Sequence, residues 1–574
     1  DSSRRKNFAV RKMFYDFLEE VGKLKFLDPA CGCGNFLLVT YKELRTLEMA
    51  VFEYLNVGLA AFPDSFININ QFYGIDMDDW AVDISHVSML LMEHMMNLQV
   101  KDRFGADISS IPLKSSATIV KANSLTINWN DVLPASECSY ILGNPPYGGT
   151  ATTSKEQKEW LRAVYPSKYK LGNADYVTGW FVKASDYMLK NKSICTAFVA
   201  TNSICQGEQV NTLWSLMFNG GIYINFAYTS IQWSNEAADK AHVKFIIVGF
   251  SYKNKPSPAL YIVDTKTNET IVVQCSCISP YLTNCVSPTI VQRRKACFKN
   301  DLNLVRGNQP TDGGNLIFSF QEGQAMLNAH PEIKPFMKRF IGGNEVVNSE
   351  FRYCLWLKEE DKNIWSSIPV IMAHVNDCAI WRASQVETGD AFKLRDVPWR
   401  FREQIQSKHM IVIPVLSSER RLYIPIDLFD ERYIVSNLGY LLPEATYYDF
   451  GILTSQMHMV WNSFTAGRLE TRIRYSRDMT FNTFVWPEVS DEQRDEFTLG
   501  EMYNPENMPD KLKDVHARLD AAVERAYREE PFKDDEERLS FLLDLYSKAI
   551  AAEEKEKLKS AKPKKKKATV KADS

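Results

Sequence analysis

The sequence predicts an α/β fold in its first half, followed by a mixed α+β region and a helical C-terminal segment. Two observations predict this order. Up to about residue 255, apolar strands alternate with amphipathic helices, which is the pattern of a sheet with helices on both faces. From about 290 to 490 the segments become short, aromatic and punctuated by proline, and after about 491 they become charged and helical.

The first strand is expected to end at Asp28 and to lead into a turn that carries Gly32 and Gly34. Glycine lets the backbone bend tightly and approach a ligand closely. The glycine spacing matches neither a dinucleotide-binding loop nor a phosphate-binding P-loop, and a carboxylate at Asp28 suits a ligand with an ammonium group. A helix should follow, with one apolar face formed by Leu37, Leu38, Tyr41, Leu44 and Leu47.

The next two strands also end in polar side chains. Residues 72–76 place Asp76 at a strand tip, where acids typically hold a ribose diol. Residues 117–122 form a strand that ends at Asn123, a residue able to read an adenine edge. The helix between these strands is rich in methionine, and we expect core packing for Met89, Met92, Met95 and Met96.

The fourth strand, within residues 140–147, runs straight into Asn-Pro-Pro-Tyr. Both prolines fix φ and lack an N–H, so the turn is stiff and its carbonyls are free to accept hydrogen bonds. The side-chain oxygen of Asn144 and the carbonyl of Pro145 could accept both protons of one exocyclic amine, while Tyr147 lies against the ring that carries it. This turn predicts a site that grips a planar amine or amide.

These residues resemble the S-adenosylmethionine-dependent amino-methyltransferases of DNA. Residues 28–36 are similar to their first cofactor motif, and residues 144–147 to their catalytic motif. Elsewhere the chain resembles the MmeI-like (type IIL) single-chain restriction–modification enzymes, in residues 198–209, 233–237, 307–314, 339–343, 418–421 and 450–487. The resemblance implies a class I methyltransferase domain with a Rossmann-like sheet, followed by a target-recognition domain that chooses the DNA sequence.

The resemblance also implies roles for individual residues. S-adenosylmethionine would be bound by the cofactor loop, by a ribose-binding acid and by a residue near the adenine ring: Asp28, Pro29, Ala30, Gly32, Gly34, Asn35, Phe36, Asp76 and Asn123. The catalytic turn, formed by Asn144, Pro145, Pro146 and Tyr147, would hold the N6 amine of a target adenine. Because a base inside a duplex cannot reach such a pocket, the adenine would be flipped out of the DNA.

The resemblance and the change of pattern together predict four parts. These are a methyltransferase domain at 1–289, a DNA target-recognition domain at 290–490, a helical segment at 491–558 and a disordered Lys-rich tail at 559–574. Related full-length enzymes carry a nuclease domain and a further cofactor motif ahead of the first strand, whereas only about 24 residues precede Lys25. We therefore expect no DNA cleavage by this chain alone, with a nuclease or another defence subunit as a candidate partner.

The composition bounds the class of protein. A chain of 574 residues is too long for one core, so two or three domains are expected. We find no apolar run long enough to span a bilayer and no secretory leader, and the 11 scattered cysteines suit a reducing compartment. These features predict a cytoplasmic protein, and the resemblance to restriction–modification enzymes implies a bacterial or archaeal one. No metal is expected, because the C-x-C pairs at 31–33 and 275–277 lack a second pair at zinc-ligand spacing.

The net charge is −3, and the last 24 residues carry 9 Lys against 4 acids, so the rest of the chain is acidic. Attraction to double-stranded DNA must then come from local patches. The best candidate is the segment around residues 467–477, where arginines interleave with aromatic residues: Arg468, Arg472, Arg474 and Arg477. A solvated surface on an ordinary helix or loop is the alternative interpretation of this segment.

Three functions from different classes remain open at this point. The first is a DNA adenine-N6 methyltransferase in restriction–modification or related phage defence, with cytosine-N4 transfer as a minor variant. The second is a methyltransferase that acts on protein glutamine or on RNA, because such enzymes also use Asn-Pro-Pro-Tyr. The third is a non-catalytic DNA-reading subunit, which the missing N-terminal cofactor motif allows.

Overall fold

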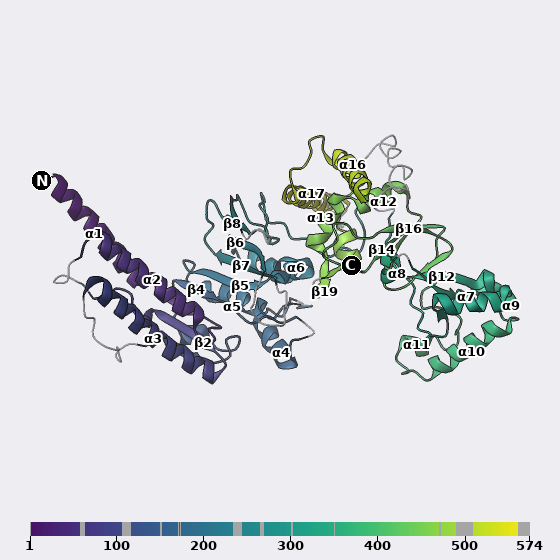
Figure 1. The fold of residues 1–574 in the computed structure, drawn as a ribbon, viewed down its shortest axis with the longest axis horizontal. Coiled ribbons are helices and arrows are strands. Elements are labelled where there is room, and N and C mark those ends of the chain that lie inside the picture. Colours follow the sequence, from purple (N-terminus) through teal and green to yellow (C-terminus); the bar gives the residue numbers. More distant parts are fainter. Residues whose placement is uncertain are drawn as a thin grey trace, which may run out of the picture. The chain divides into compact units, whose positions relative to one another are not determined.

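The computed structural model describes residues 2–57, 64–105, 116–149, 152–169, 171–172, 174–232, 244–263, 269–299, 302–348, 350–469, 472–488 and 509–560. The chain divides into two compact units, Asp1–Ile290 and Val291–Ser574, and each is described by itself (Figure 1). The motif at residues 233–237 and the Lys-rich tail beyond residue 560 lie outside the described residues. Within the described ranges, no helix is long and apolar enough to cross a membrane.

The first unit is built on a nine-stranded sheet with the order β3-β2-β1-β4-β5-β7-β6-β8-β9. Strands β1 to β5 are mutually parallel, and β7 runs antiparallel to both of its neighbours. The strands are β1 Phe26–Asp28, β2 Phe72–Asp76, β3 Thr118–Lys121, β4 Tyr140–Gly143, β5 Cys195–Thr201, β6 Tyr223–Gln232, β7 Lys244–Ser251, β8 Ala259–Val263 and β9 Thr270–Gln274. This is the mixed α/β, Rossmann-like sheet expected of a class I methyltransferase, so the predicted fold class is confirmed.

The first helix precedes β1, and the other helices of this unit follow the parallel strands β1, β2, β4 and β5. They are α1 Ser2–Gly22, α2 Asn35–Tyr54, α3 Asp79–Phe104, α4 Lys155–Val164, α5 Thr178–Met188 and α6 Gly207–Asn219, with short 3-10 turns at Ile69–Gln71, Trp129–Asp131 and Asn202–Cys205. Figure 1 shows α2 and α3 beside β2, and α5 and α6 beside β5 and β7. Crossovers between parallel strands are right-handed, and the two halves of the sheet progress in opposite directions from β1. Their helices therefore cover opposite faces.

The order of the strands creates the position of the site. The chain moves outward from β1 through β2 to β3, then returns to the other side of β1 with β4 and β5. Strands β1 and β4 are direct neighbours, with Phe26 opposite Tyr140 and Leu27 opposite Ile141. At such a switch point the two following loops diverge and leave a crevice at the carboxyl ends of the strands. The loops after Asp28 and after Gly143 therefore flank one crevice.

Helices α2 and α3 pack on the β1–β3 half of the sheet through one face each. Leu37, Tyr41, Met89 and Met96 belong to this core and are fully or almost fully buried. Two predicted members turn away from it: the exposed fraction is 41% for Leu47 and 53% for Met95. Met95 precedes Met96 and so points about 100° round the helix from it, and the prediction of core packing was wrong for Met95. Leu47 was predicted to lie on the apolar face of its helix, but its side chain is exposed.

A buried polar cluster joins α2 to α3. Arg45 forms an ion pair with Glu48 at 3.0 Å and donates a hydrogen bond to the hydroxyl of Tyr41 at 2.8 Å. Glu93 of α3 is also buried, and burial raises its pKa to about 7, against the opposing charge of Arg45. Arg45 also donates to Oδ1 of Asn97 in α3 at 3.2 Å, which links the two helices. Glu93 makes the stability of this layer depend on pH.

The second unit contains three small sheets. Their orders are β10-β18-β14-β16, β11-β13-β12-β17 and β15-β20-β19. The strands are β10 Val305–Arg306, β11 Ile317–Phe318, β12 Met337–Ile341, β13 Arg352–Leu355, β14 His409–Pro414, β15 Leu416–Ser417, β16 Asp427–Asp430, β17 Tyr433–Val435, β18 Gly439–Pro443, β19 Gly467–Leu469 and β20 Arg472–Arg474. One core cluster of this unit packs α7 and α10 against the β11-β13-β12-β17 sheet.

Helices fill the rest of the second unit. They are α7 Phe320–Ala329, α8 Gly343–Asn348, α9 Lys362–Trp365, α10 Pro369–Ala383, α11 Asp390–Lys393, α12 Tyr447–Thr454, α13 Gln456–Thr465, α16 Pro509–Tyr527 and α17 Asp535–Ser560. Short turns lie at Pro331–Phe336, Glu359–Asp361 and Arg477–Phe481. The predicted C-terminal helical segment includes α16 and α17, and each helix buries apolar side chains: Leu519 and Val523 in α16 and Leu542 in α17.

The motif at residues 307–314 is structural. Asn308 is fully buried, and its side chain bonds the backbones of Ile405 and Val435. Arg382 of α10 is also fully buried and donates five hydrogen bonds to backbone carbonyls, two of them in this motif (Pro310 and Thr311). Both side chains therefore replace backbone pairing that the loop lacks.

Candidate active site

The loop after β1 is held by backbone hydrogen bonds to the end of β2. The N–H of Cys31 donates to the carbonyl of Ile75 at 3.1 Å, and the N–H of Gly32 donates to Oδ2 of Asp76 at 2.9 Å. Gly34 begins α2 with φ +83°, a left-handed conformation that favours glycine. A Cβ there would lie 2.4 Å from Oγ of Ser85, so only glycine lets α2 start this close to α3.

Asp28, at the tip of β1, is fully buried. Its Oδ1 accepts a hydrogen bond from the N–H of Ala30 at 3.0 Å, and its Oδ2 has no hydrogen-bond partner among the described residues. Burial, with a smaller contribution from the charge of Asp76, raises the pKa of Asp28 to about 7. Gly143 of β4 makes room for this carboxyl group, because a Cβ at Gly143 would lie 2.6 Å from Oδ1. The two strand ends are thus fitted to each other.

Asp76 is the last residue of β2 and Asn123 follows β3, and their side chains make different contacts. Asp76 is half-buried, and its two oxygens accept from the N–H groups of Gly32 and Asp78, which fixes the carboxylate at the crevice. The Oδ1 of Asn123 accepts from the N–H of Leu125 at 2.9 Å and so closes a local turn. Its neighbours Ala122 and Ser124, rather than Asn123, face the cavity described below.

The loop after β4 brings Asn144 and Tyr147 together. The hydroxyl of Tyr147 donates to Oδ1 of Asn144, and the exposed fraction of Tyr147 is 37%. Burial, followed by the nearby charge of Asp175, raises the pKa of Tyr147 to about 12, so its hydroxyl stays a donor at neutral pH. An amide oxygen has two lone pairs, and the contact with Tyr147 leaves Asn144 able to accept a second hydrogen bond.

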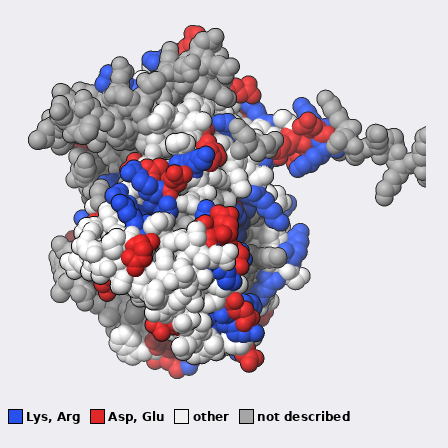
Figure 2. Space-filling model, turned by 90° about the vertical axis from the view of Figure 1, so that its right-hand side faces the viewer, with Lys and Arg blue, Asp and Glu red and all other residues white. Residues whose placement is uncertain are grey.

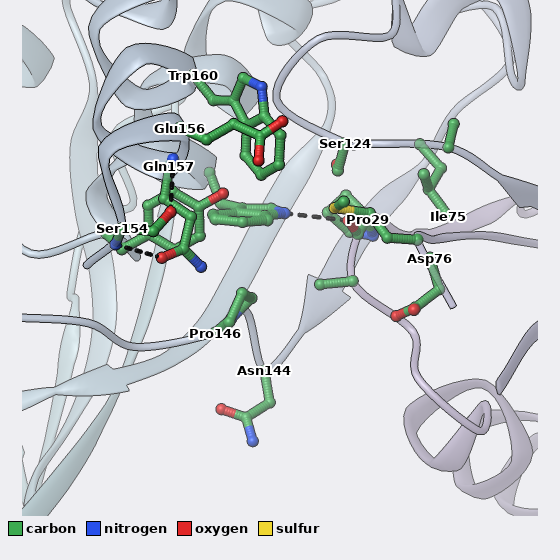
Figure 3. Close-up of a pocket in the computed structure, with 15 residues that line it drawn as sticks. Pro29, Ile75, Asp76, Ser124, Asn144, Pro146, Ser154, Glu156, Gln157 and Trp160 are labelled. Carbon is green, nitrogen blue, oxygen red and sulfur yellow. Dashed lines mark hydrogen bonds between the residues drawn. The ribbon is translucent and has the colours of Figure 1, made fainter. Parts of the chain in front are cut away.

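A cavity of about 620 Å³ opens at this switch point. Figure 3 shows Ser154, Glu156, Gln157 and Trp160 on one side and Pro29, Ile75 and Asp76 on the other, with Asn144 and Pro146 below. Its walls come from all four strand ends and from α4 and α5: Pro29, Ala30, Ile75, Asp76, Met77, Ala122, Ser124, Asn144, Pro146, Ser154, Glu156, Gln157, Trp160, Tyr176 and Trp180.

The structure brings five of the predicted site residues to this cavity: Pro29, Ala30, Asp76, Asn144 and Pro146. The other predicted ones lie in the same loops without lining it: Asp28, Gly32, Gly34, Asn35, Phe36, Asn123, Pro145 and Tyr147. Sequence reasoning missed the wall formed by α4 and α5. The Ser154–Gln157 capping box signals where α4 begins, but no local signal shows that Trp160, Tyr176 and Trp180 face a ligand site.

The predicted DNA-contacting arginines lie on and beside the β19–β20 pair of the second unit. Arg472 and Arg474 are exposed on β20, whereas burial lowers the pKa of Arg468, which donates to the carbonyl of Ser463. Arg477 pairs with Asp478 at 2.8 Å. On the face seen in Figure 2, basic side chains form several separate groups beside acidic ones. The four arginines therefore stand in different environments, with Arg472 and Arg474 the most accessible.

Comparison with known proteins identifies the family. Three family models match in succession: the MmeI DNA-methyltransferase domain at residues 4–262, the MmeI target recognition domain at 286–488 and the MmeI C-terminal domain at 489–552. A solved structure of the type IIL restriction–modification enzyme MmeI in complex with DNA is 34% identical, with a TM-score of 0.78. The matched region covers 94% of this chain and 75% of the MmeI chain. The chain belongs to the MmeI family.

Curated relatives agree with this membership. The MmeI-family chain is 40% identical over 560 residues to "DNA methyltransferase A" of Bacillus subtilis (strain 168), which covers 92% of this chain. The chain spans only 62% of the length of that relative. A shorter match, 26% identical over 159 residues and 27% of this chain, is to "Adenine-specific methyltransferase BrxX" of Escherichia coli O9:H4 (strain HS).

Nowhere in the described part of the chain do three or more His, Cys, Asp or Glu side chains gather as metal ligands would.

Proposed function

We propose that this MmeI-family chain is the modification and specificity part of a restriction–modification or related phage-defence system. It transfers a methyl group from S-adenosylmethionine to the N6 amine of an adenine flipped out of double-stranded DNA. The observation that carries the proposal is one cavity lined by both Asp76 and Asn144, at the switch point between β1 and β4. The MmeI–DNA structure and the names of the Bacillus and BrxX relatives support the choice of DNA and of adenine.

The residues at the crevice fit S-adenosylmethionine. A cavity of about 620 Å³ falls within the range of sites for small organic ligands. The fixed carboxylate of Asp76 suits the ribose hydroxyls. The buried Oδ2 of Asp28, which has no hydrogen-bond partner in the described part of the chain, suits a cationic amine near the glycine loop. When bound, S-adenosylmethionine supplies an electrophilic methyl group. Pro29, Ala30, Gly32, Gly34, Asn35, Phe36 and the neighbourhood of Asn123 complete the proposed cofactor pocket.

The turn at residues 144–147 orients the amine. Oδ1 of Asn144 and the carbonyl oxygen of Pro145 accept hydrogen bonds from the two N–H groups of the amine. This arrangement directs the nitrogen lone pair toward the methyl donor. The same two oxygens stabilise the positive charge that develops on N6 during transfer, until the surplus N6 proton is released to solvent. Pro145 and Pro146 keep the turn stiff, and Tyr147 stacks on the base. Alignment of the reacting atoms supplies much of the remaining acceleration.

The second unit would select the DNA sequence. Arg472 and Arg474 are exposed and suit contacts to phosphates or base edges. Arg468 and Arg477 of the same segment are proposed to contribute to the same DNA contact. We propose the domain boundaries 1–289, 290–490 and 491–558 with the tail at 559–574, and a nuclease or another defence subunit as a partner.

Tritiated S-adenosylmethionine tests the transfer. We expect label to enter double-stranded DNA with the wild-type chain and not with Asn144→Ala. Asn130→Ala is a matched control, because that amide packs in a surface turn after β3. Label in RNA or protein instead of DNA would contradict the proposal. Calorimetry that finds DNA binding without cofactor binding would favour a non-catalytic reader.

A further inference from the structure

Asp175 lies just before α5 and only 4% of its surface is exposed. Its carboxyl group accepts four hydrogen bonds. Oδ1 accepts from the N–H groups of Gly148 at 2.9 Å and Val177 at 3.3 Å, and Oδ2 accepts from the hydroxyls of Thr201 and Ser203, both at 3.0 Å. The two oxygens thus face two different parts of the chain.

The Oδ1 side fixes the downstream end of the Asn144–Tyr147 turn. Gly148 follows Tyr147 directly; its N–H donates to Asp175, and its carbonyl accepts from the N–H of Tyr176 at 2.9 Å and the hydroxyl of Thr153 at 3.1 Å. The upstream end is fixed separately, because Gly143 pairs with Phe198 in the β4–β5 register. The turn is therefore a short, proline-stiffened bridge with both ends held.

The Oδ2 side is anchored to the carboxyl end of β5. Thr201 is the last residue of that strand, Ser203 follows in a 3-10 turn, and their hydroxyls lie 2.5 Å apart. In addition, the backbone N–H of Asp175 donates to Oε1 of Gln209 in α6 at 2.8 Å. Thr201, Ser203 and Gln209 all belong to the segment 198–209. No residue of this segment has another role in the proposed chemistry.

We propose that Asp175, supported by Thr201 and Ser203, is a positioning residue that sets where Asn144 and Tyr147 stand relative to the cavity. The inference rests on the proposed function, since it assigns the residue to the same reaction. Asp175 touches neither the base nor the methyl donor in this scheme; it acts through Gly148. Loss of the contact lets the turn move, and a misplacement of about 1 Å can cost about 100-fold in rate.

The chemistry of the contacts predicts a contrast between two substitutions. Asp175→Ala removes the acceptors of all four bonds. Asp175→Asn keeps Oδ1 for the two backbone N–H groups and places an amide NH2 opposite Thr201 and Ser203, whose hydroxyls accept as well as donate. A positioning role therefore predicts that Asn restores what Ala loses. A role that needs the negative charge predicts that the two variants fail alike.

The test measures kcat and KM for methyl transfer to double-stranded DNA, and cofactor affinity by calorimetry. We expect Asp175→Ala to lower kcat by about 10- to 100-fold with KM values and cofactor Kd within about threefold. Asp175→Asn should stay within about fivefold of wild type. Thr196→Val is the matched control, because among the described residues the buried hydroxyl of Thr196, also on β5, contacts only the sulfur of Met188. Its kcat should not change.

Unchanged kcat in Asp175→Ala, or an equal loss in Asp175→Asn, would overturn the inference. If Asp175→Ala does not fold, the Thr201→Val/Ser203→Ala double variant decides, because it removes the support of Oδ2 and leaves the backbone contacts of Oδ1. We expect it to lower kcat without raising KM, and an unchanged kcat would again overturn the inference. Failure of the proposed function looks different, since the wild-type chain itself would then label no DNA.

Discussion

The substitution Asp28→Asn should change how the stability of this protein depends on pH. Asp28 is fully buried, and its pKa of about 7 lies well above the ordinary value of 3.8. The folded protein therefore holds a proton that the unfolded chain releases between about pH 4 and 7. The free energy of unfolding falls as pH rises through this window and levels off above pH 7.

The magnitude follows from the two pKa values. Their difference corresponds to about 4 kcal/mol that this single group removes from stability between pH 4 and pH 8. Asparagine has nearly the same shape, keeps an oxygen for the N–H of Ala30 and does not titrate in this range. The variant should therefore gain stability relative to wild type as pH rises, by a few kcal/mol across the window.

Urea unfolding at pH 5, 6, 7 and 8 measures this difference directly. Glu93→Gln should behave in the same way, because burial raises the pKa of Glu93 to about 7 as well. Asp79→Asn is the negative control, since Asp79 is exposed and pairs with Lys121 at the surface. A difference between Asp28→Asn and wild type that stays constant from pH 5 to pH 8 would refute the reasoning.

Three further predictions concern the site. Gly34→Ala should cost about 1–3 kcal/mol of stability, because the new Cβ meets Oγ of Ser85 at 2.4 Å and φ is +83°; a neutral effect in urea unfolding would contradict the close approach of α2 and α3. Tyr147→Phe should keep kcat/KM within about threefold, whereas Tyr147→Ala should lose about 10- to 100-fold with the stacking surface; equal losses would argue for a hydroxyl role. Arg474→Ala should weaken DNA binding and lower the slope of log affinity against log salt by about 1; an unchanged slope would remove Arg474 from the interface.

Much of the fold could be predicted because strand ends leave local signals. Asp28, Asp76 and Asn144 each follow an apolar strand, and parallel strands carry such residues to one edge of a sheet. Helix α2 follows from the spacing of Leu37 and Tyr41. The same spacing wrongly predicts a buried position for Leu47, because an apolar residue near the edge of a helical face can point to solvent without disturbing the pattern.

The remainder of the site depends on contacts between distant segments. Nothing near Asp175 in the sequence shows that its partners are Gly148, Thr201 and Ser203, since these bonds form only when β4 and β5 lie side by side. The cavity wall of α4 is similar: a capping box marks its start, and only the packing shows that Trp160 faces Asn144 across a cavity.

The second unit was harder to predict for the same reason. Its motif at residues 307–314 carries no regular pattern, and it is held by Arg382, which lies some seventy positions further along the chain. A buried arginine that bonds backbone carbonyls leaves no periodic or compositional signal. The four arginines of residues 468–477 illustrate the converse, because one sequence pattern placed them in buried, paired and exposed environments.

The most direct test of the central claim is the identity of the methylated base. Double-stranded DNA treated with the chain and isotopically labelled S-adenosylmethionine is digested to nucleosides and analysed by mass spectrometry. The account predicts labelled N6-methyladenine with the wild-type chain and its disappearance with Asn144→Ala. Labelled N4-methylcytosine, or methyladenine that persists in Asn144→Ala, would contradict the role given to the turn after β4.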